Sequence, residues 1–307
     1  MPSAPAPSSA STSAAEPPWT VKRLLEWTGE FFKRKDVDSP RLSAEMLLAH
    51  VLELQRIALY TNYDRPLTPT ELASFRDLVK RAGEHEPVRY LVGVAPFYGL
   101  DFKVTPAVLI PRPDTETIVE TALHQLRLAS DTGLEQSLRI ADVCTGSGCI
   151  GLALAHQLRA ATVVAVDLSE AAAAVARENA ERLKLADRFD VRVGDLLEPL
   201  AGEPPFDLIV SNPPYIPSAA ISTLDRNVRD YEPHLALDGG DDGLDLIRRL
   251  LTGAARHLVA GGRLYVEMQF DQAAAAMELA RAAGGWTDLQ ILRDLGGRER
   301  ALFARKA

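Results

Sequence analysis

The chain has 307 residues, of which 47% are hydrophobic and 25% charged. This composition is typical of a soluble globular protein with about two domains, and it excludes wholly disordered, collagen-like and coiled-coil classes. No apolar run approaches the ~20 residues that a transmembrane helix requires. The two cysteines, Cys144 and Cys149, cannot build a disulfide framework, so we expect reduced thiols in a cytoplasmic protein.

The net charge is −8, and it is unevenly distributed. Residues 19–90 carry 12 Lys/Arg and 11 Asp/Glu, whereas residues 91–307 carry 22 and 30. A protein that grips duplex DNA usually presents a basic face or a basic domain. The charge balance therefore argues against DNA as a substrate, and we expect no direct nucleic-acid partner.

The chain begins with a segment unlike the rest. Residues 1–18 are mainly Ala, Pro and Ser, a composition that predicts a disordered tail. The segment has neither the apolar stretch of a secretory signal nor the arginines of a transit peptide. Residues 19–91 then show apolar residues at helical spacing and predict a small helical bundle.

Three N-caps are predicted in this bundle, at Thr20, at Ser39 before Pro40, and at Thr68 before Pro69. Ser and Thr accept from free N–H groups at a helix start, and proline is favoured at the first helical position. In the first helix we expect the large apolar side chains, Trp27 among them, to face the core.

Residues 92–114 predict a short hairpin, over 97–104, and a proline-rich linker. From residue 115 to residue 307, strand and helix patterns alternate. Buried strands are predicted over 138–143, 162–166, 190–193, 207–210 and 262–268, and helices over 150–158, 171–183 and 244–258. Repeated β-α units of this kind predict an α/β domain with a parallel sheet wrapped by helices.

A glycine-rich turn follows the first of these strands, with Gly146 and Gly148 at the start of the next helix. Glycines there let a ligand approach the backbone at a helix N-terminus. Asp167 ends the next strand, where a carboxylate can accept both ribose hydroxyls of an adenosine cofactor. A dinucleotide site is the alternative, although the G-x-G-x-x-G spacing begins only at Gly146. A tight turn without a ligand is a further alternative.

A second motif, Asn212-Pro213-Pro214-Tyr215, follows the strand predicted over 207–210 and should face the same cleft. Asn212 offers a side-chain carbonyl, and Pro214 restricts Pro213 to an extended conformation that can leave its carbonyl free. Two acceptors and the aromatic face of Tyr215 suit a planar NH2 group. The alternative is a proline-terminated strand with an exposed tyrosine.

Together the two motifs resemble the S-adenosylmethionine-dependent methyltransferases that act on amide or amino nitrogen, in which N/D-P-P-Y holds the target NH2. Within that group, four further segments are similar to the HemK/PrmC family, and the resemblance covers about residues 19–307. They are VLIPRPDTE at 108–116, YEPHLALDGG at 231–240, Gly243-Leu244 and GRER at 297–300. Members of this family methylate the side-chain nitrogen (N5) of the glutamine in the Gly-Gly-Gln motif of class I peptide chain release factors.

The resemblance implies a Rossmann-like S-adenosylmethionine-dependent methyltransferase sheet over 115–307, and a helical domain over 19–91 that recognises the release factor. It also implies residue roles. Asn212 is implied to touch both cofactor and substrate, and with Pro213, Pro214 and Tyr215 to hold the glutamine. The cofactor would be bound by Cys144, Thr145, Gly146, Ser147 and Gly148 around its methionyl part, Asp167 at the ribose, and Asp195 and Leu196 at the adenine.

Two points of detail follow from the resemblance. Cys144 stands where the family often has glycine, and we expect cofactor binding to survive this change. The loop over residues 112–116 either shapes the pocket or acts as a structural clasp.

The six histidines are scattered without metal-ligand spacing, so no metal is expected.

Three alternative functions share some of these features. A glutamine methyltransferase of a ribosomal protein shares the tetrapeptide, but the Arg-Pro-Asp-Thr-Glu form of the loop at 112–116 favours a release factor. A DNA adenine N6-methyltransferase is disfavoured by the acidic catalytic domain. A non-catalytic cofactor-binding scaffold would require a broken turn or tetrapeptide, and both are intact. No membrane partner is expected.

Overall fold

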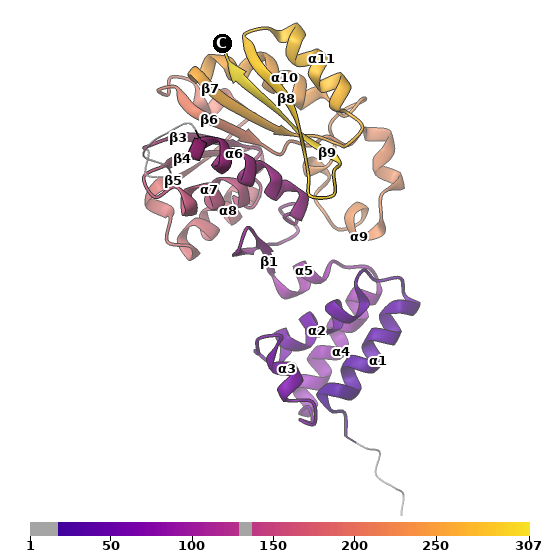
Figure 1. Cartoon of the computed structure of the whole chain (residues 1–307). Helices are drawn as coiled ribbons and strands as arrows, with labels where there is room; N and C mark the ends of the chain where they lie inside the picture. Colours follow the sequence, from indigo (N-terminus) through magenta and orange to yellow (C-terminus); the bar gives the residue numbers. More distant parts are fainter. Residues whose placement is uncertain (1–17, 129–136) are drawn as a thin grey trace, which may run out of the picture. The chain divides into compact units, whose positions relative to one another are not determined.

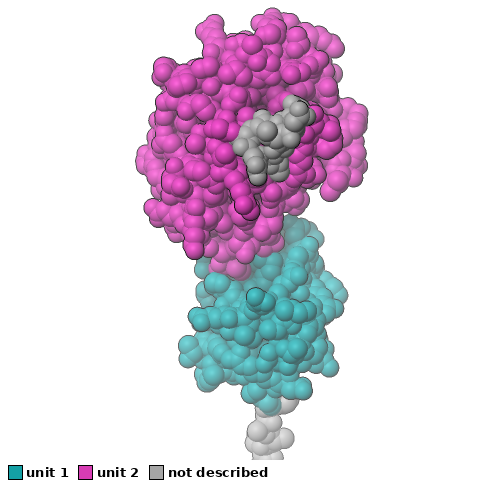
Figure 2. Space-filling model, turned by 60° about the vertical axis from the view of Figure 1, so that its left-hand side comes forward, with its two compact units in different colours: residues 1–88 teal, residues 89–307 magenta. Residues whose placement is uncertain are grey.

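The computed structural model describes residues 18–128 and 137–307. The tail expected over residues 1–18 lies, except for its last residue, outside the described residues. The chain divides into two compact units, Met1–Val88 and Arg89–Ala307, which are coloured separately in Figure 2.

The first unit is helical. Its helices are α1 (Val21–Arg34), α2 (Pro40–Val51), α3 (Ala58–Thr61) and α4 (Pro69–Gly83), and α5 (Val88–Val92) crosses the boundary between the units. The Thr68 cap is confirmed, because its hydroxyl accepts from Glu71 N–H at 3.3 Å while the Glu71 carboxylate accepts from Thr68 N–H at 2.8 Å. Thr20 likewise accepts from Arg23 N–H. These reciprocal contacts satisfy N–H groups that the helix cannot satisfy itself.

Two expectations for this unit are wrong. Ser39 has a left-handed backbone (φ 45°) and makes no side-chain cap bond, because capping requires an extended residue that aims its hydroxyl along the helix. Trp27 is 48% exposed. The buried stripe of α1 runs through Leu24, Thr28 and Phe32 at intervals of four residues, and Trp27 lies one position beside it.

The second unit opens with a hairpin formed by β1 (Val94–Phe97) and β2 (Leu100–Lys103), whose first strand begins three residues before the hairpin predicted over 97–104. Tyr98 and Gly99 in the turn have φ of 48° and 76°. Positive φ at both central residues is the backbone that matches the twist of paired strands.

A seven-stranded sheet in the order β5-β4-β3-β6-β7-β9-β8 forms the centre of this unit (Figure 1). The strands are β3 (Arg139–Val143), β4 (Thr162–Asp167), β5 (Phe189–Val193), β6 (Phe206–Ser211), β7 (Leu258–Glu267), β8 (Trp286–Arg293) and β9 (Glu299–Lys306). The first five are parallel, as predicted. β9 is antiparallel to both β7 and β8, so the sheet is mixed. A short turn rather than a helix joins β8 to β9, and a short turn forces antiparallel pairing.

Helices cover both faces of the sheet (Figure 1). One face packs against α6 (Glu116–Leu128), α7 (Cys149–Gln157) and α8 (Glu170–Arg182), and the other against α10 (Asp245–Gly253) and α11 (Ala273–Ala283). Side chains along β3 alternate between the two cores, with Ile140 on the first face and Ala141 on the second. The Rossmann-like α/β class is thereby confirmed.

Some element ends differ from the sequence prediction. The helix expected over 244–258 ends at Gly253, and β7 begins at Leu258, four residues before the strand predicted over 262–268. The remaining short elements are α9 (Arg226–Arg229) and the 3-10 segments η1 (Pro113–Thr115), η2 (Ala186–Arg188), η3 (Glu198–Leu200), η4 (Ser218–Thr223), η5 (His234–Ala236) and η6 (Ala254–His257).

The chain leaves β3 toward β4 and β5 on one side and returns to place β6 on the other. The loops after β3 and β6 therefore diverge at the carboxyl edge of the sheet, where ligands bind in open α/β folds. The glycine-rich turn and the Asn212 tetrapeptide both lie at this point.

The two predicted caps of α2 and α4 provide a matched pair for a stability test. Thr68→Ala removes a cap bond and should lower the free energy of unfolding by about 1 kcal/mol. Ser39→Ala removes no such bond and should change it by less than about 0.5 kcal/mol. Urea unfolding followed by tryptophan fluorescence is the measurement, and equal losses in both variants would contradict the assignment.

Candidate functional site

A cavity with an open volume of about 980 Å³ lies at the carboxyl ends of the parallel strands. Most of the predicted site residues line it: Cys144, Thr145, Gly146, Ser147, Asp167, Asp195, Leu196, Asn212 and Pro214. Gly148, Pro213 and Tyr215 are not among the described residues that line it. The rest of the wall includes Arg112 and Thr115, from the segment before α6.

The backbone of the turn after β3 explains its glycines. Gly146 has φ of 54°, and a Cβ placed there would meet no atom within 4 Å, so the space beside it is open to a ligand. Gly148 has φ of 82° and precedes α7, where a Cβ would come within 2.9 Å of Leu152. One glycine therefore leaves room for a ligand, and the other allows the helix to pack.

Cys144 also has a positive φ, 61°. This left-handed backbone is costly for a residue with a Cβ, and glycine adopts it without strain. Burial raises the pKa of the Cys144 thiol and raises that of Cys149 to about 12. Both thiols therefore stay protonated and are poor nucleophiles.

Asp142, at the end of β3, is fully buried and ties the turn to α7. Its Oδ2 accepts from the Thr145 hydroxyl at 2.6 Å and from Gly151 N–H at 2.9 Å. Oδ1 has no partner among the described residues. Burial raises the pKa of this carboxyl to about 7, against the lowering effect of its two donors.

Asp167, at the end of β4, fixes the other side of the turn. Its Oδ2 accepts from Gly146 N–H at 2.8 Å and its Oδ1 from Ser169 N–H at 2.9 Å. Burial raises its pKa, and the backbone hydrogen bonds oppose that rise. A carboxylate oxygen can accept more than one hydrogen bond, so Asp167 can still accept hydrogen bonds from hydroxyl groups of a ligand in the cavity.

Asp195 and Leu196 follow β5 on the same wall. The Asp195 carboxylate pairs with Arg249 at 2.8 Å, while Leu196 is buried and has φ of 48°. An adenosine-containing ligand would fit this wall. The wall combines the apolar side chain of Leu196 with the carboxylate of Asp167 and the open space at Gly146. The residues present therefore suit the cofactor that the sequence implies.

The tetrapeptide after β6 is held on two sides. Asn212 Nδ2–H donates to the Thr115 hydroxyl at 3.3 Å, which leaves its Oδ1 available as an acceptor. The Tyr215 hydroxyl donates to Glu267 Oε1 at 3.2 Å, and its main-chain carbonyl accepts from Gln272 Nε2 at 2.9 Å. The position of the tyrosine ring is therefore set by the protein.

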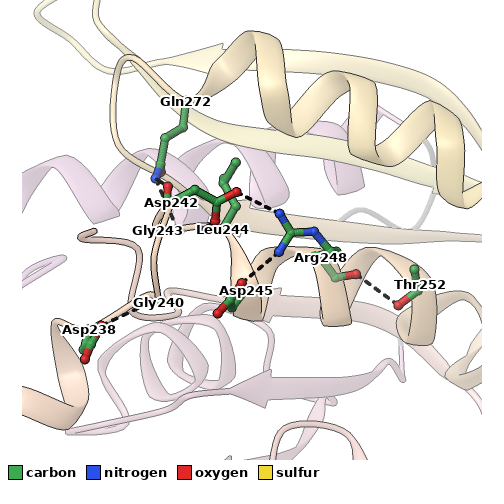
Figure 3. Close-up of polar contacts among 9 residues, drawn as sticks. All are labelled: Asp238, Gly240, Asp242, Gly243, Leu244, Asp245, Arg248, Thr252 and Gln272. Atoms are coloured by element: carbon green, nitrogen blue, oxygen red, sulfur yellow. Dashed lines mark hydrogen bonds and ion pairs between the residues drawn. The ribbon is translucent and has the colours of Figure 1, made fainter. Parts of the chain in front are cut away.

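Gln272 links the loop before α10 to the tetrapeptide, and Figure 3 shows the polar contacts of this loop with Gln272 and Arg248. Gln272 Nε2–H donates to the carbonyl of Gly243 as well as to that of Tyr215. A Cβ at Gly243 would lie 2.3 Å from the Tyr215 carbonyl oxygen, so only glycine fits there. Arg248 bonds Asp242 at 2.9 Å and Asp245 at 2.8 Å, which closes the loop onto the helix.

Two buried acids near these motifs were not predicted from the sequence. Glu267, at the end of β7, is 1% exposed, and burial raises its pKa to about 7. Glu232 accepts from Arg112 at 2.6 Å and from Ile110 N–H at 3.3 Å. The Arg112 loop therefore both lines the cavity and is clasped to Glu232. Their positions in the sequence could have indicated both acids. Glu267 lies at the end of a predicted strand, and Glu232 lies in the segment 231–240 that is similar to the HemK/PrmC family.

Sequence models of two protein families match the chain. The PrmC N-terminal domain matches residues 23–93, and the methyltransferase small domain matches residues 126–240. Curated relatives named release factor glutamine methyltransferase match almost the whole chain. That of Rhodopirellula baltica is 43% identical over 94% of this chain and 97% of its own length. That of Geobacter sulfurreducens is 45% identical, with the same two coverages.

Solved structures share the fold of the sheet. The N-terminal domain of human METTL16 in complex with SAH has a TM-score of 0.51 and 18% identity over 68% of this chain and 76% of that one. Among the described residues, no group of three potential metal ligands is found. In the same ranges no helix is long and apolar enough to cross a membrane.

Asp167 can be tested by its effect on the affinity for S-adenosylmethionine. Asp167→Ala removes a charged acceptor, which costs about 1.5–3 kcal/mol, so affinity should fall at least about tenfold. Asp187→Ala, an exposed acid outside the cavity, is the matched control and should bind normally. Calorimetry measures both, and unchanged binding by Asp167→Ala would remove this residue from the site.

Proposed function

Because the chain belongs to the release factor glutamine methyltransferase family, we propose that it methylates the glutamine side-chain nitrogen in the Gly-Gly-Gln motif of class I peptide chain release factors. The enzyme is a methyltransferase that uses S-adenosylmethionine. One observation supports the proposal most: a single cavity joins the turn at Gly146, the Asp167 carboxylate and the free carbonyl of Asn212.

The cofactor carries the methyl group on a positively charged sulfur. When the methyl group is transferred, this sulfur becomes a neutral thioether. We assign its ribose to Asp167 and its methionyl part to the turn over 144–148. Leu196 gives an apolar wall for the adenine ring. These assignments use lone pairs and open space that the fold itself does not fill.

An amide nitrogen is a weak nucleophile because its lone pair is delocalised into the carbonyl. The protein must therefore place this nitrogen on the line of the methyl group, and such alignment can supply about 7–11 kcal/mol. We propose that Asn212 Oδ1 and the Pro213 carbonyl accept hydrogen bonds from the two N–H groups of the substrate NH2. The new N–C bond forms as the methyl–sulfur bond breaks, and the nitrogen then releases one proton to water. Both acceptors also stabilise the positive charge that develops on nitrogen.

Methylation of purified candidates with labelled cofactor tests the substrate class. Release factor, ribosomal proteins and DNA are the three arms. Labelling of the Gly-Gly-Gln glutamine is expected, and the glutamine-to-glutamate variant of that motif is the control. Labelling of a ribosomal protein or DNA in preference to release factor would overturn the proposal.

The Asn212 carbonyl should matter for chemistry more than for binding. Asn212→Ala removes one preorganised partner and should lower the single-turnover rate of a preformed ternary complex by about 10²–10³-fold. Asn212→Asp keeps acceptor oxygens at the same place and should lose less. A rate for Asn212→Ala within a few-fold of the parent would show that Asn212 does not position the acceptor nitrogen.

We further propose that the first unit contacts the release factor through the groove between α1 and α4. The groove has an open volume of about 940 Å³ and an aromatic lining that includes Trp19, Trp27 and Phe31. Trp27 stacks on Phe31 with ring centroids 5.3 Å apart. Three basic residues, Lys35, Arg76 and Lys80, and one acid, Glu84, also line the groove. The balance is positive, so an apolar segment with acidic neighbours would complement it.

Exposed aromatic anchors often dominate the energy of a protein interface. Trp27→Ser should therefore raise the KM for release factor at least about fivefold and leave the rate at saturation unchanged. Ile57→Ser replaces another exposed apolar side chain of the same unit, 70% exposed and outside the groove. It should behave like the parent. Equal KM values for both variants and the parent would place the contact elsewhere.

A further inference from the structure

The side-chain amide of an asparagine can take two orientations related by a 180° flip, and only one of them offers its carbonyl oxygen to a substrate NH2. In this structure Asn212 Nδ2–H donates to Thr115 Oγ1 at 3.3 Å. Thr115 is 1% exposed, and both residues line the cavity. The seating of the amide therefore depends on a hydroxyl 97 positions away in the sequence.

A threonine hydroxyl can donate as well as accept, so something must decide its direction. Glu267 is the nearby buried acid, and in its ionised form its carboxylate can only accept hydrogen bonds. Burial raises the pKa of Glu267, and the Thr115 hydroxyl opposes that rise. Glu267 Oε2 has no hydrogen-bond partner among the described residues. A Thr115 hydroxyl proton directed at this carboxylate would leave an oxygen lone pair for Asn212 Nδ2–H.

The same carboxylate holds the other end of the tetrapeptide. Its Oε1 accepts from the Tyr215 hydroxyl at 3.2 Å. Arg300, which pairs with Asp114 at 2.8 Å, favours the charged form of Glu267 electrostatically. This buried acid thus holds the tetrapeptide through the Tyr215 hydroxyl.

We propose that Thr115 is a positioning residue that fixes the orientation of the Asn212 amide, so that Oδ1 rather than Nδ2 faces the substrate nitrogen. This inference rests on the proposed function, since it assigns the Asn212 carbonyl to a substrate NH2. Without the Thr115 acceptor, the Asn212 amide samples both of its flipped orientations. In the inverted orientation, Nδ2–H instead of Oδ1 faces the substrate NH2, so two hydrogen-bond donors oppose each other. The hydroxyl matters here, and the methyl group of Thr115 does not.

Single-turnover methyl transfer in preformed ternary complexes tests this. Thr115→Val keeps the side-chain shape and removes the hydroxyl, and we expect a rate about tenfold lower, the factor for one ordinary hydrogen bond. Thr115→Ser restores the hydroxyl and should stay within about threefold of the parent. A Thr115→Val rate within twofold of the parent would overturn the inference, as would equal losses in the Val and Ser variants.

A double-mutant cycle separates positioning from a general structural effect. If Thr115 acts through Asn212, then Asn212→Ala with Thr115→Val should be no slower than Asn212→Ala alone. If the two losses multiply, Thr115 does not act through Asn212, and the inference fails. Calorimetry should show S-adenosylmethionine affinity within twofold of the parent in Thr115→Val.

Thr28→Val provides the matched control. Thr28 is a fully buried threonine of α1 whose hydroxyl has no partner among the described residues. Thr28→Val makes the same chemical change as Thr115→Val, and the variant protein should transfer methyl groups at the parent rate. The assay uses whichever acceptor the parent methylates, so preference for a ribosomal protein or DNA overturns the release factor proposal alone. A parent that methylates none of them overturns both.

Discussion

Strands β3 and β6 pair side by side although Val143 and Ser211 are 68 positions apart, and the Ser211 hydroxyl donates to the Val143 carbonyl at 2.7 Å at the point where both strands end. The arrangement of the site depends on this contact. It brings the turn that begins at Cys144 and the tetrapeptide that begins at Asn212 to the same edge of the sheet. Because the next strands lie on opposite sides of this pair, the two loops separate and leave the cavity between them.

Buried acids hold the loops around that cavity. Asp142 fixes the turn to α7, Glu232 fixes the Arg112 loop, and Glu267 holds Tyr215. Burial raises the pKa of all three carboxyls. A buried carboxyl costs free energy unless donors surround it, so the chain accepts some loss of stability in return for defined loop positions. Sites that must align a nitrogen with a methyl group need that rigidity.

Local signals predicted much of the fold. The Thr68-Pro69 cap, the hairpin turn at Tyr98-Gly99 and the five parallel strands follow from neighbouring residues, and the structure confirms them. Predictions that needed more than local pattern were wrong. Ser39 has the residue type of a cap but not the backbone, and Trp27 lies beside the buried stripe of α1. The antiparallel β9 was missed because its partners, β7 and β8, are chosen by packing rather than by its own sequence.

The sequence by itself determined the chemistry that the site can offer: glycines where the backbone must be open, a carboxylate at Asp167, and an amide and two prolines after β6. Residue types and short spacings are local properties, so they are legible without a structure. Only the tertiary structure decided how these groups are used. Asn212 Nδ2–H donates to Thr115, and Tyr215 is held by Glu267 and Gln272, all from distant segments. Orientation depends on partners that folding brings together, and sequence spacing carries no record of which partners those are.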